Sequence, residues 1–132
     1  MQEISKSILL IDDDEINNFL TNELIKMDHP EVFINSIQYV QDAINELLEK
    51  IENNLSLPQI ILVDINMPVL NGWDFLDAFE KMDEHFIKNV KVYIYTSSIY
   101  YKDIEKAKKY TSVLKLITKP LSEQLIKEIL ID

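Results

Sequence analysis

The chain has 132 residues, 47% of them hydrophobic, and a formal net charge of −10. This length fits one domain with a buried core, which excludes intrinsic disorder, and the acidic balance disfavours nucleic acid and anionic membranes as partners because their phosphates would be repelled. With one glycine and no cysteine, glycine-rich nucleotide loops and thiol chemistry are excluded as well.

The start of the chain carries no targeting signal. Residues 1–6 lack the apolar stretch that a signal peptide needs, and no apolar run approaches the roughly 20 residues of a membrane span. We therefore expect a cytoplasmic protein with one domain over residues 1–132, no output domain and no membrane association.

Apolar runs and helical spacings alternate along the first half of the chain. The run over 7–11 predicts a strand buried on both faces. From Glu15 the spacing becomes helical, with Asp14 as N-cap, and one face of this helix collects Ile16, Phe19, Leu20, Leu24 and Met27. A short strand over 32–34, a helix over 40–51 and a second buried strand over 59–63 follow.

The second half continues the alternation. A helix is expected after Gly72, then a connector over 85–89, and the last predicted elements are a strand over 90–95, a helix over 103–110, a strand over 113–117 and a helix capped by Ser122. Strands and helices in strict alternation predict an α/β fold, an open, doubly wound parallel sheet of five strands with five helices on its faces.

Polar residues stand where the predicted strands end: Asp12, Asp13, Asp64, Thr96 and Lys119. Singly, each has an ordinary explanation as a cap, a turn former or a solvated loop residue. In an open α/β sheet, however, ligands lie beyond the carboxyl ends of the strands. Three close carboxylates repel one another unless a cation lies among them, and all-oxygen ligation is typical of Mg²⁺. A lysine and a hydroxyl beside them would complete a site for a phosphoryl group, with a carboxylate as nucleophile.

Five motifs carry a resemblance to a known family: Ile11-Asp12-Asp13-Asp14, Asp64-Ile65-Asn66-Met67-Pro68, Asn71-Gly72, Tyr95-Thr96-Ser97 and Lys119-Pro120. In order, spacing and placement at strand ends, the chain resembles the receiver domain of bacterial two-component response regulators. The resemblance covers about residues 7–131 and implies a flavodoxin-like receiver fold with strand order 2-1-3-4-5.

The resemblance also implies a function for the acidic residues. Asp64 would accept a phosphoryl group from the phosphohistidine of a sensor histidine kinase or a histidine phosphotransfer protein. Mg²⁺ would be held by Asp13, Asp64 and the backbone carbonyl of Asn66, with Asp12 acting mainly through water. The protein would signal through a surface over roughly 98–131, by binding an unknown downstream protein or by onward phosphotransfer, and its own chemistry would be limited to self-phosphorylation and self-dephosphorylation.

The remaining motif residues would act on the phosphate. Lys119 would pair with the acyl phosphate and Thr96 would move to hydrogen-bond it, while Asn66 and Ser98 match positions that tune self-dephosphorylation. Leu116 departs from the family pattern, because it stands where the family often has a Phe or Tyr that switches rotamer with the threonine.

Two alternatives stay open at this point. The sequence Asp12-x-Asp14 also resembles haloacid-dehalogenase-type phosphatases, which need a late acidic pair for Mg²⁺, and for that role the chain offers only Glu123, Glu128 and Asp132. The motif after the third strand would then have no role. The other alternative is a binding module that keeps the receiver fold and is never phosphorylated, since fold alone does not determine function.

Overall fold

A single parallel sheet forms the centre of the computed structural model, which describes residues 6–131. Its strands are β1 (Ser7–Ile11), β2 (Phe33–Ile37), β3 (Ile60–Val63), β4 (Lys91–Thr96) and β5 (Val113–Thr118). The spatial order β2-β1-β3-β4-β5 confirms the predicted topology. All neighbouring pairs are parallel, and Ile11 of β1 lies opposite Val63 of β3, so these two strands end side by side.

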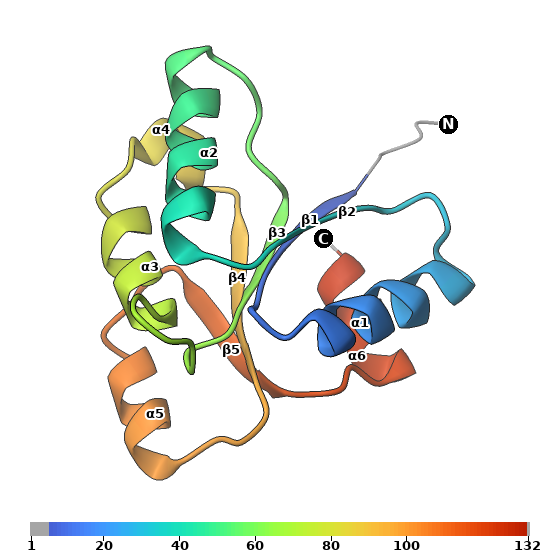
Figure 1. The fold of residues 1–132 in the computed structure, drawn as a ribbon. Coiled ribbons are helices and arrows are strands. Elements are labelled where there is room, and N and C mark those ends of the chain that lie inside the picture. Colours follow the sequence, from blue (N-terminus) through green and yellow to red (C-terminus); the bar gives the residue numbers. More distant parts are fainter. Residues whose placement is uncertain (1–5, 132) are drawn as a thin grey trace.

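Helices cover both faces of the sheet (Figure 1). They are α1 (Glu15–Asp28), α2 (Val40–Glu52), α3 (Gly72–Phe79), α4 (Glu84–Ile87), α5 (Tyr101–Ala107) and α6 (Glu123–Leu130). Helices α1 and α6 pack on one face, and α2, α3 and α5 lie on the other. None of the helices in the described part of the chain is long and apolar enough to span a membrane.

The prediction of five helices was wrong by one, because α4 forms where a connector was expected. This helix is a single turn, and Asp83 caps it by accepting a hydrogen bond from the backbone N–H of His85 at 2.9 Å. It buries no residue, so the sequence carries no apolar stripe that would indicate it.

The core is divided between the two faces by the alternation of side chains along each strand. In β1, Leu9 and Ile11 pack toward α2 and α3, while Ile8 and Leu10 pack toward α1 and α6. Strand β3 divides its four buried residues in the same way. Both faces are covered, which explains why these strands read as continuous apolar runs.

Helix α1 buries a different face from the one that its apolar spacing indicates. Four of the five residues expected to share a face are exposed to solvent: Ile16, Phe19, Leu20 and Met27. The buried residues are Asn18, Thr21 and Ile25. Two of them are polar and have distant partners, since Asn18 donates to the Asp12 carbonyl at 2.9 Å and Thr21 hydrogen-bonds the Tyr95 hydroxyl at 2.9 Å. These partners make burial of the polar face possible.

Contacts with the Trp73 ring join α3 to α5 and to the loop that follows α5. The rings of Trp73 and Tyr110 stack with their centroids 5.7 Å apart, and the Tyr110 hydroxyl donates a 2.7 Å hydrogen bond to Asp77. Burial and this carboxylate acceptor raise the pKa of Tyr110 to about 12. Lys106 of α5 places its Nζ 4.8 Å from the centre of the Trp73 ring, which is within cation–π range.

Candidate functional site

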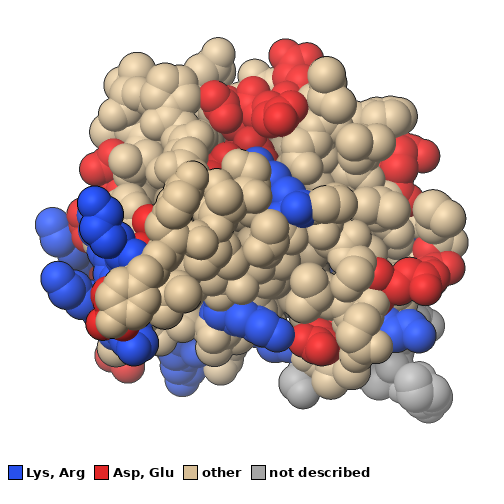
Figure 2. Space-filling view, turned by 90° about the horizontal axis from the view of Figure 1, so that it is seen from below, with Lys and Arg blue, Asp and Glu red and all other residues tan. Residues whose placement is uncertain are grey.

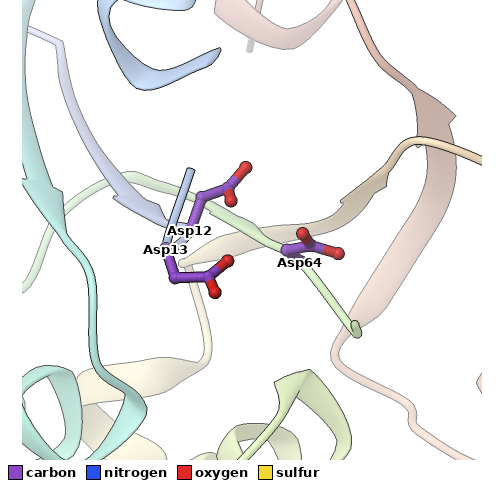
Figure 3. A group of neighbouring side chains, drawn as sticks. All are labelled: Asp12, Asp13 and Asp64. Atoms are coloured by element: carbon purple, nitrogen blue, oxygen red, sulfur yellow. The ribbon is translucent and has the colours of Figure 1, made fainter. Parts of the chain in front are cut away.

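Three carboxylates meet at the carboxyl ends of β1 and β3 (Figure 3). Asp12, Asp13 and Asp64 each offer an oxygen atom, and these atoms lie within 4.8 Å of one another. Asp12 and Asp64 are buried, whereas Asp13 is exposed. The topology explains the convergence, because Asp12 and Asp13 follow β1, Asp64 follows β3, and these two strands are adjacent.

Lys119 joins this cluster from the loop after β5. Its Nζ lies 2.5 Å from Asp12 Oδ2 and 3.0 Å from Asp64 Oδ2. The backbone N–H of Lys119 donates to the carbonyl of Thr96 at 2.8 Å, which fixes this loop to the end of β4. The pocket that holds the cluster has a volume of about 470 Å³ and opens to solvent beside α1.

Burial and charge shift the pKa values of the central ion pair. Burial raises the pKa of Asp12, and the hydrogen bond to Lys119 opposes that rise only in part. For Lys119, burial alone would lower the pKa, but the hydrogen bonds to Asp12 and Asp64 raise it above its usual value. The lysine is therefore charged at neutral pH and offsets part of the repulsion among the carboxylates.

Asn66 connects the cluster to Thr96. Its backbone N–H donates to Asp64 Oδ1 at 2.9 Å, and its side-chain Nδ2 donates to Thr96 Oγ1 at 3.0 Å. Thr96 is fully buried at the end of β4 and Asn66 is exposed. All the residues singled out from the strand ends are thus gathered at one edge of the sheet.

Two asparagines of α1 also support the cluster, and sequence reasoning missed them. Asn17 donates to Asp12 Oδ2 at 3.1 Å, and Asn18 donates to the Asp12 carbonyl at 2.9 Å. The backbone N–H of Asp14 donates to the other carboxylate oxygen of Asp12 at 3.0 Å. The available signal was a pair of amide side chains in the first turn of the helix that follows the acidic triplet.

Leu116 occupies the position where the family often has an aromatic residue, and Tyr95 is the buried aromatic residue next to Thr96. Leu116 is half-buried and packs against the core beneath α2, α3 and α5. Tyr95 is fully buried on the opposite face, toward α1 and α6, and its ring centre lies 5.8 Å from Lys119 Nζ. The buried aromatic residue next to Thr96 therefore faces α1, where it contacts Thr21.

The loop between β3 and α3 packs tightly on Asp64. Asn71 caps α3 in a capping box, in which its side chain accepts from the backbone N–H of Asp74 while the Asp74 side chain accepts from that of Asn71. Gly72 is the first residue of the helix, and a Cβ atom there would lie 2.5 Å from the carbonyl oxygen of Asp64. Glycine is required at this position by the close approach of the two backbone segments.

Val69 in the same loop is strained. Its φ is 66°, a left-handed conformation that disfavours β-branched residues, and its side chain is fully exposed. We expect Val69→Asn to raise the free energy of unfolding by about 1 kcal/mol, because asparagine tolerates this conformation and no packing is lost. Chemical denaturation measures the effect, and Val69→Thr, which keeps the β-branch, is the control. Equal stability of the two variants would show that strain is absent.

The fold and the acidic pocket place the chain in the flavodoxin-like class of doubly wound α/β proteins, whose sites lie at the carboxyl edge of the sheet. Within that class, residues 8–131 match the model of the response regulator receiver domain. The chain therefore belongs to the response regulator receiver domain family. No protein among those with curated descriptions matches it.

Solved structures agree with this assignment. A two-component response regulator from Cytophaga hutchinsonii is 36% identical, with a TM-score of 0.85 over 97% of this chain and 95% of its own. A two-component response regulator from Legionella pneumophila is 24% identical, with a TM-score of 0.80 over 94% of each chain. The Mn²⁺-bound form of the response regulator Rcp1 is 23% identical and shares the fold, with a TM-score of 0.72 over 94% of this chain and 88% of that one.

Proposed function

We propose that this chain is a phosphoacceptor of two-component signal transduction, which takes a phosphoryl group onto Asp64. One observation carries the proposal: a buried carboxylate at a strand end lies beside two further carboxylates and 3.0 Å from a lysine Nζ. Family membership supports it. The donor would be the phosphohistidine of a sensor histidine kinase or of a histidine phosphotransfer protein, meeting this chain in the cytoplasm.

The acidic cluster fits a divalent cation. Its three carboxylates offer oxygen atoms within 4.8 Å of one another. Mg²⁺ prefers hard oxygen ligands and usually keeps water at several of its coordination positions. We propose that Asp12, Asp13, Asp64 and the backbone carbonyl of Asn66 hold Mg²⁺, with Asp12 acting mainly through water. When bound, the ion would neutralise the charge on the phosphoryl oxygens.

The transfer itself needs one nucleophile and groups that offset negative charge. A carboxylate oxygen of Asp64 attacks the phosphorus, the new P–O bond forms as the P–N bond to the donor imidazole breaks, and the imidazole leaves with that electron pair. Lys119 balances the charge of the acyl phosphate because its Nζ already lies at hydrogen-bond distance from Asp64. The Thr96 hydroxyl, which Asn66 contacts at 3.0 Å, would donate to a phosphoryl oxygen.

An exposed apolar surface beside the pocket supports docking of a donor protein. Ile16, Phe19 and Leu20 are exposed on α1, and Leu20 also lines the pocket of the acidic cluster. Apolar side chains of this size, exposed next to a reactive group, are typical of an interaction surface. Output would then occur by phosphorylation-dependent protein binding or by onward transfer, without turnover of a substrate.

The phosphatase alternative lacks its acidic pair in the pocket. The Glu128 carboxylate lies 3.2 Å from Lys115 Nζ in an exposed ion pair between α6 and β5, and Glu123 is exposed in the first turn of α6. Asp132, the third candidate, lies outside the described residues. Neither described carboxylate is among the lining of the pocket that holds Asp64.

Acyl-phosphate labelling tests the proposal. Incubation with Mg²⁺ and acetyl phosphate is expected to add the mass of one phosphoryl group to the intact chain. Asp64→Asn and chelation of the metal ion should each abolish the added mass, whereas Asp77→Asn, an exposed carboxylate on α3, should label like the wild type. Equal labelling of Asp64→Asn would overturn Asp64 as the acceptor, and no labelling of the wild type would favour a binding module that is not phosphorylated.

A further inference from the structure

The largest fully buried side chain in the described part of the chain is Tyr95, the residue before Thr96. A buried tyrosine hydroxyl needs a hydrogen-bond partner, and this one has Thr21 Oγ1 of α1 at 2.9 Å. Thr21 is only 1% exposed, so the hydrogen bond joins β4 to α1 inside the core. Val92 and Ile94 of the same strand are aliphatic core residues that need no such partner. The tyrosine therefore makes a polar contact that packing alone does not require.

The Tyr95 ring lies beside Lys119, which differs from the other lysines in its setting. Most lysines of the chain are exposed, and Figure 2 shows lysine side chains gathered along the left flank of one face. The side chain of Lys119 is only 11% exposed. Its Nζ lies 5.8 Å from the centre of the Tyr95 ring, within cation–π range, and its backbone N–H donates to the Thr96 carbonyl at 2.8 Å. Two consecutive residues of β4 thus contact both ends of this lysine.

The hydroxyl of Tyr95 also contacts the segment that follows Lys119. Burial raises the pKa of Tyr95, and the hydrogen bonds with Thr21 and with the backbone of Leu121 oppose that rise. Leu121 is buried two residues after the lysine, in the same core as the tyrosine. The ring therefore contacts the lysine itself, and the hydroxyl contacts the chain just beyond it.

The ammonium group of Lys119 needs such contacts to stay in one place. A lysine has a flexible stem of four carbons, and its three donors can turn toward several acceptors. Here Nζ lies between two carboxylates, 2.5 Å from Asp12 and 3.0 Å from Asp64. The face of an aromatic ring attracts an ammonium group without neutralising it. The Tyr95 ring is therefore a third, uncharged contact that limits how far the ammonium can move between the carboxylates.

We propose that Tyr95 is a positioning residue that holds the ammonium group of Lys119 in place and links it to α1 through Thr21. Helix α1 then acts on both members of the buried ion pair, because Asn17 donates to Asp12 Oδ2 at 3.1 Å and Thr21 acts on the lysine through the tyrosine. Placement matters because a displacement of roughly 1 Å can slow a reaction by about a hundredfold. The effect on phosphoryl transfer rests on the proposed phosphoacceptor, whereas the position of the lysine does not.

Tyr95→Phe tests the proposal because it removes the hydroxyl and keeps the ring. At saturating Mg²⁺ and acetyl phosphate we expect it to slow labelling by about tenfold, which is less than the effect of removing the lysine itself. The Mg²⁺ concentration for half-maximal labelling should stay near the wild-type value, because the three carboxylates are unchanged. A general loosening of the site would raise that concentration as well.

NMR measures the position of Lys119 directly, without Mg²⁺ or a phosphoryl donor. In protein labelled with ¹³C at lysine Cε, the spectrum of Lys119→Met identifies the Lys119 signal by its loss. Phenylalanine and tyrosine rings have similar ring currents. A changed chemical shift in Tyr95→Phe therefore reports movement of the lysine relative to the ring.

Two further variants separate positioning from ordinary packing. Tyr93→Phe removes a hydroxyl from the same face of β4 and should leave the labelling rate and the Lys119 signal unchanged. Thr21→Val/Tyr95→Phe replaces both partners of the hydrogen bond by apolar groups, so neither hydroxyl is left unpaired in the core. We expect this double variant to remain about tenfold slow, because the link to α1 stays broken.

Several results would overturn the inference. These are a wild-type labelling rate or an unshifted Lys119 signal in Tyr95→Phe, an equal effect of Tyr93→Phe, and recovery of the wild-type rate in Thr21→Val/Tyr95→Phe. If the wild type is not labelled but the Lys119 signal shifts in Tyr95→Phe alone of the two single variants, the role of Asp64 is overturned and the positioning of the lysine is supported. Circular dichroism checks that each variant is folded.

Discussion

Lys119→Met is expected to slow phosphorylation of Asp64 by about a hundredfold and to lower the free energy of unfolding by about 3 kcal/mol at pH 7. The Nζ of Lys119 lies 2.5 Å from Asp12 and 3.0 Å from Asp64, and all three side chains are largely buried. Removing the cation leaves two buried carboxylates without their counter-charge. It also removes the group that offsets the charge developing on the phosphoryl oxygens.

The stability loss in Lys119→Met is expected to shrink as the pH falls. Burial already raises the pKa of Asp12 above its ordinary value, and Lys119 opposes that rise. Without the lysine, the folded-state pKa of Asp12 rises further, so the folded chain binds a proton more tightly than the unfolded chain does. The free energy of unfolding of the variant then falls as the pH increases from the pKa of Asp12 in the unfolded chain to its raised pKa in the folded chain. The stability loss caused by Lys119→Met is therefore smaller at pH 5 than at pH 7.

Urea unfolding at pH 5 and at pH 7 measures the loss of stability in Lys119→Met. The rate of mass gain with acetyl phosphate measures how much the phosphorylation of Asp64 is slowed. Lys115→Met is the matched control, because Lys115 pairs with Glu128 at 3.2 Å on the exposed edge of β5. We expect it to leave both stability and labelling nearly unchanged, as exposed ion pairs contribute little. If Lys115→Met and Lys119→Met change stability and labelling by the same amounts, the buried ion pair of Lys119 contributes no more to either than an exposed ion pair does.

The sheet and the meeting point of the site residues were predictable from the sequence because they depend on strong, local signals. A run such as Ile8 to Ile11 is apolar on both faces, which only a covered strand tolerates. Once strands and helices alternate, topology brings strand ends together, and the placement of Asp12, Asp64, Thr96 and Lys119 follows from it.

The orientation of α1 was not predictable in this way. Its buried polar residues depend on partners that are distant in sequence, as with Thr21 and Tyr95, which are 74 positions apart. Apolar periodicity is reliable only when burial is driven by apolar area, and here Ile16 and Phe19 stay exposed while the polar Asn18 and Thr21 are buried. The side-chain contact between Asn66 and Thr96 is hidden for the same reason, since it joins the loop after β3 to the end of β4.

Gly72 illustrates a different limit. The sequence Asn71-Gly72 reads as a turn, and turn glycines are usually explained by a positive φ. In the structure Asn71 is a helix cap, and Gly72 is buried in the first turn of α3 against the carbonyl of Asp64. The need for glycine arises from a close approach between two segments, which no local pattern in the sequence reveals.

Gly72→Ala is therefore expected to destabilise the protein by about 2–4 kcal/mol and to reduce labelling of Asp64 strongly. The added Cβ would lie 2.5 Å from the Asp64 carbonyl oxygen and 2.9 Å from the Cα of Ile65. Both are backbone atoms, so either α3 or the end of β3 must shift, and Asp64 moves relative to Asp12 and Lys119. Thermal unfolding and acetyl-phosphate labelling measure the two effects.

The sign of the change in the free energy of unfolding of Gly72→Ala distinguishes a packing effect from an effect of helix propensity. Alanine is favoured over glycine inside a helix by about 1 kcal/mol, so propensity alone would make the variant more stable than the wild type. Asn71→Ala is the control at the same helix end, because it removes the capping box at a loss of about 1 kcal/mol without pressing on Asp64, and labelling should persist. A Gly72→Ala protein as stable as the wild type, or an Asn71→Ala protein equally defective in labelling, would show that the close approach to Asp64 does not position the phosphoacceptor.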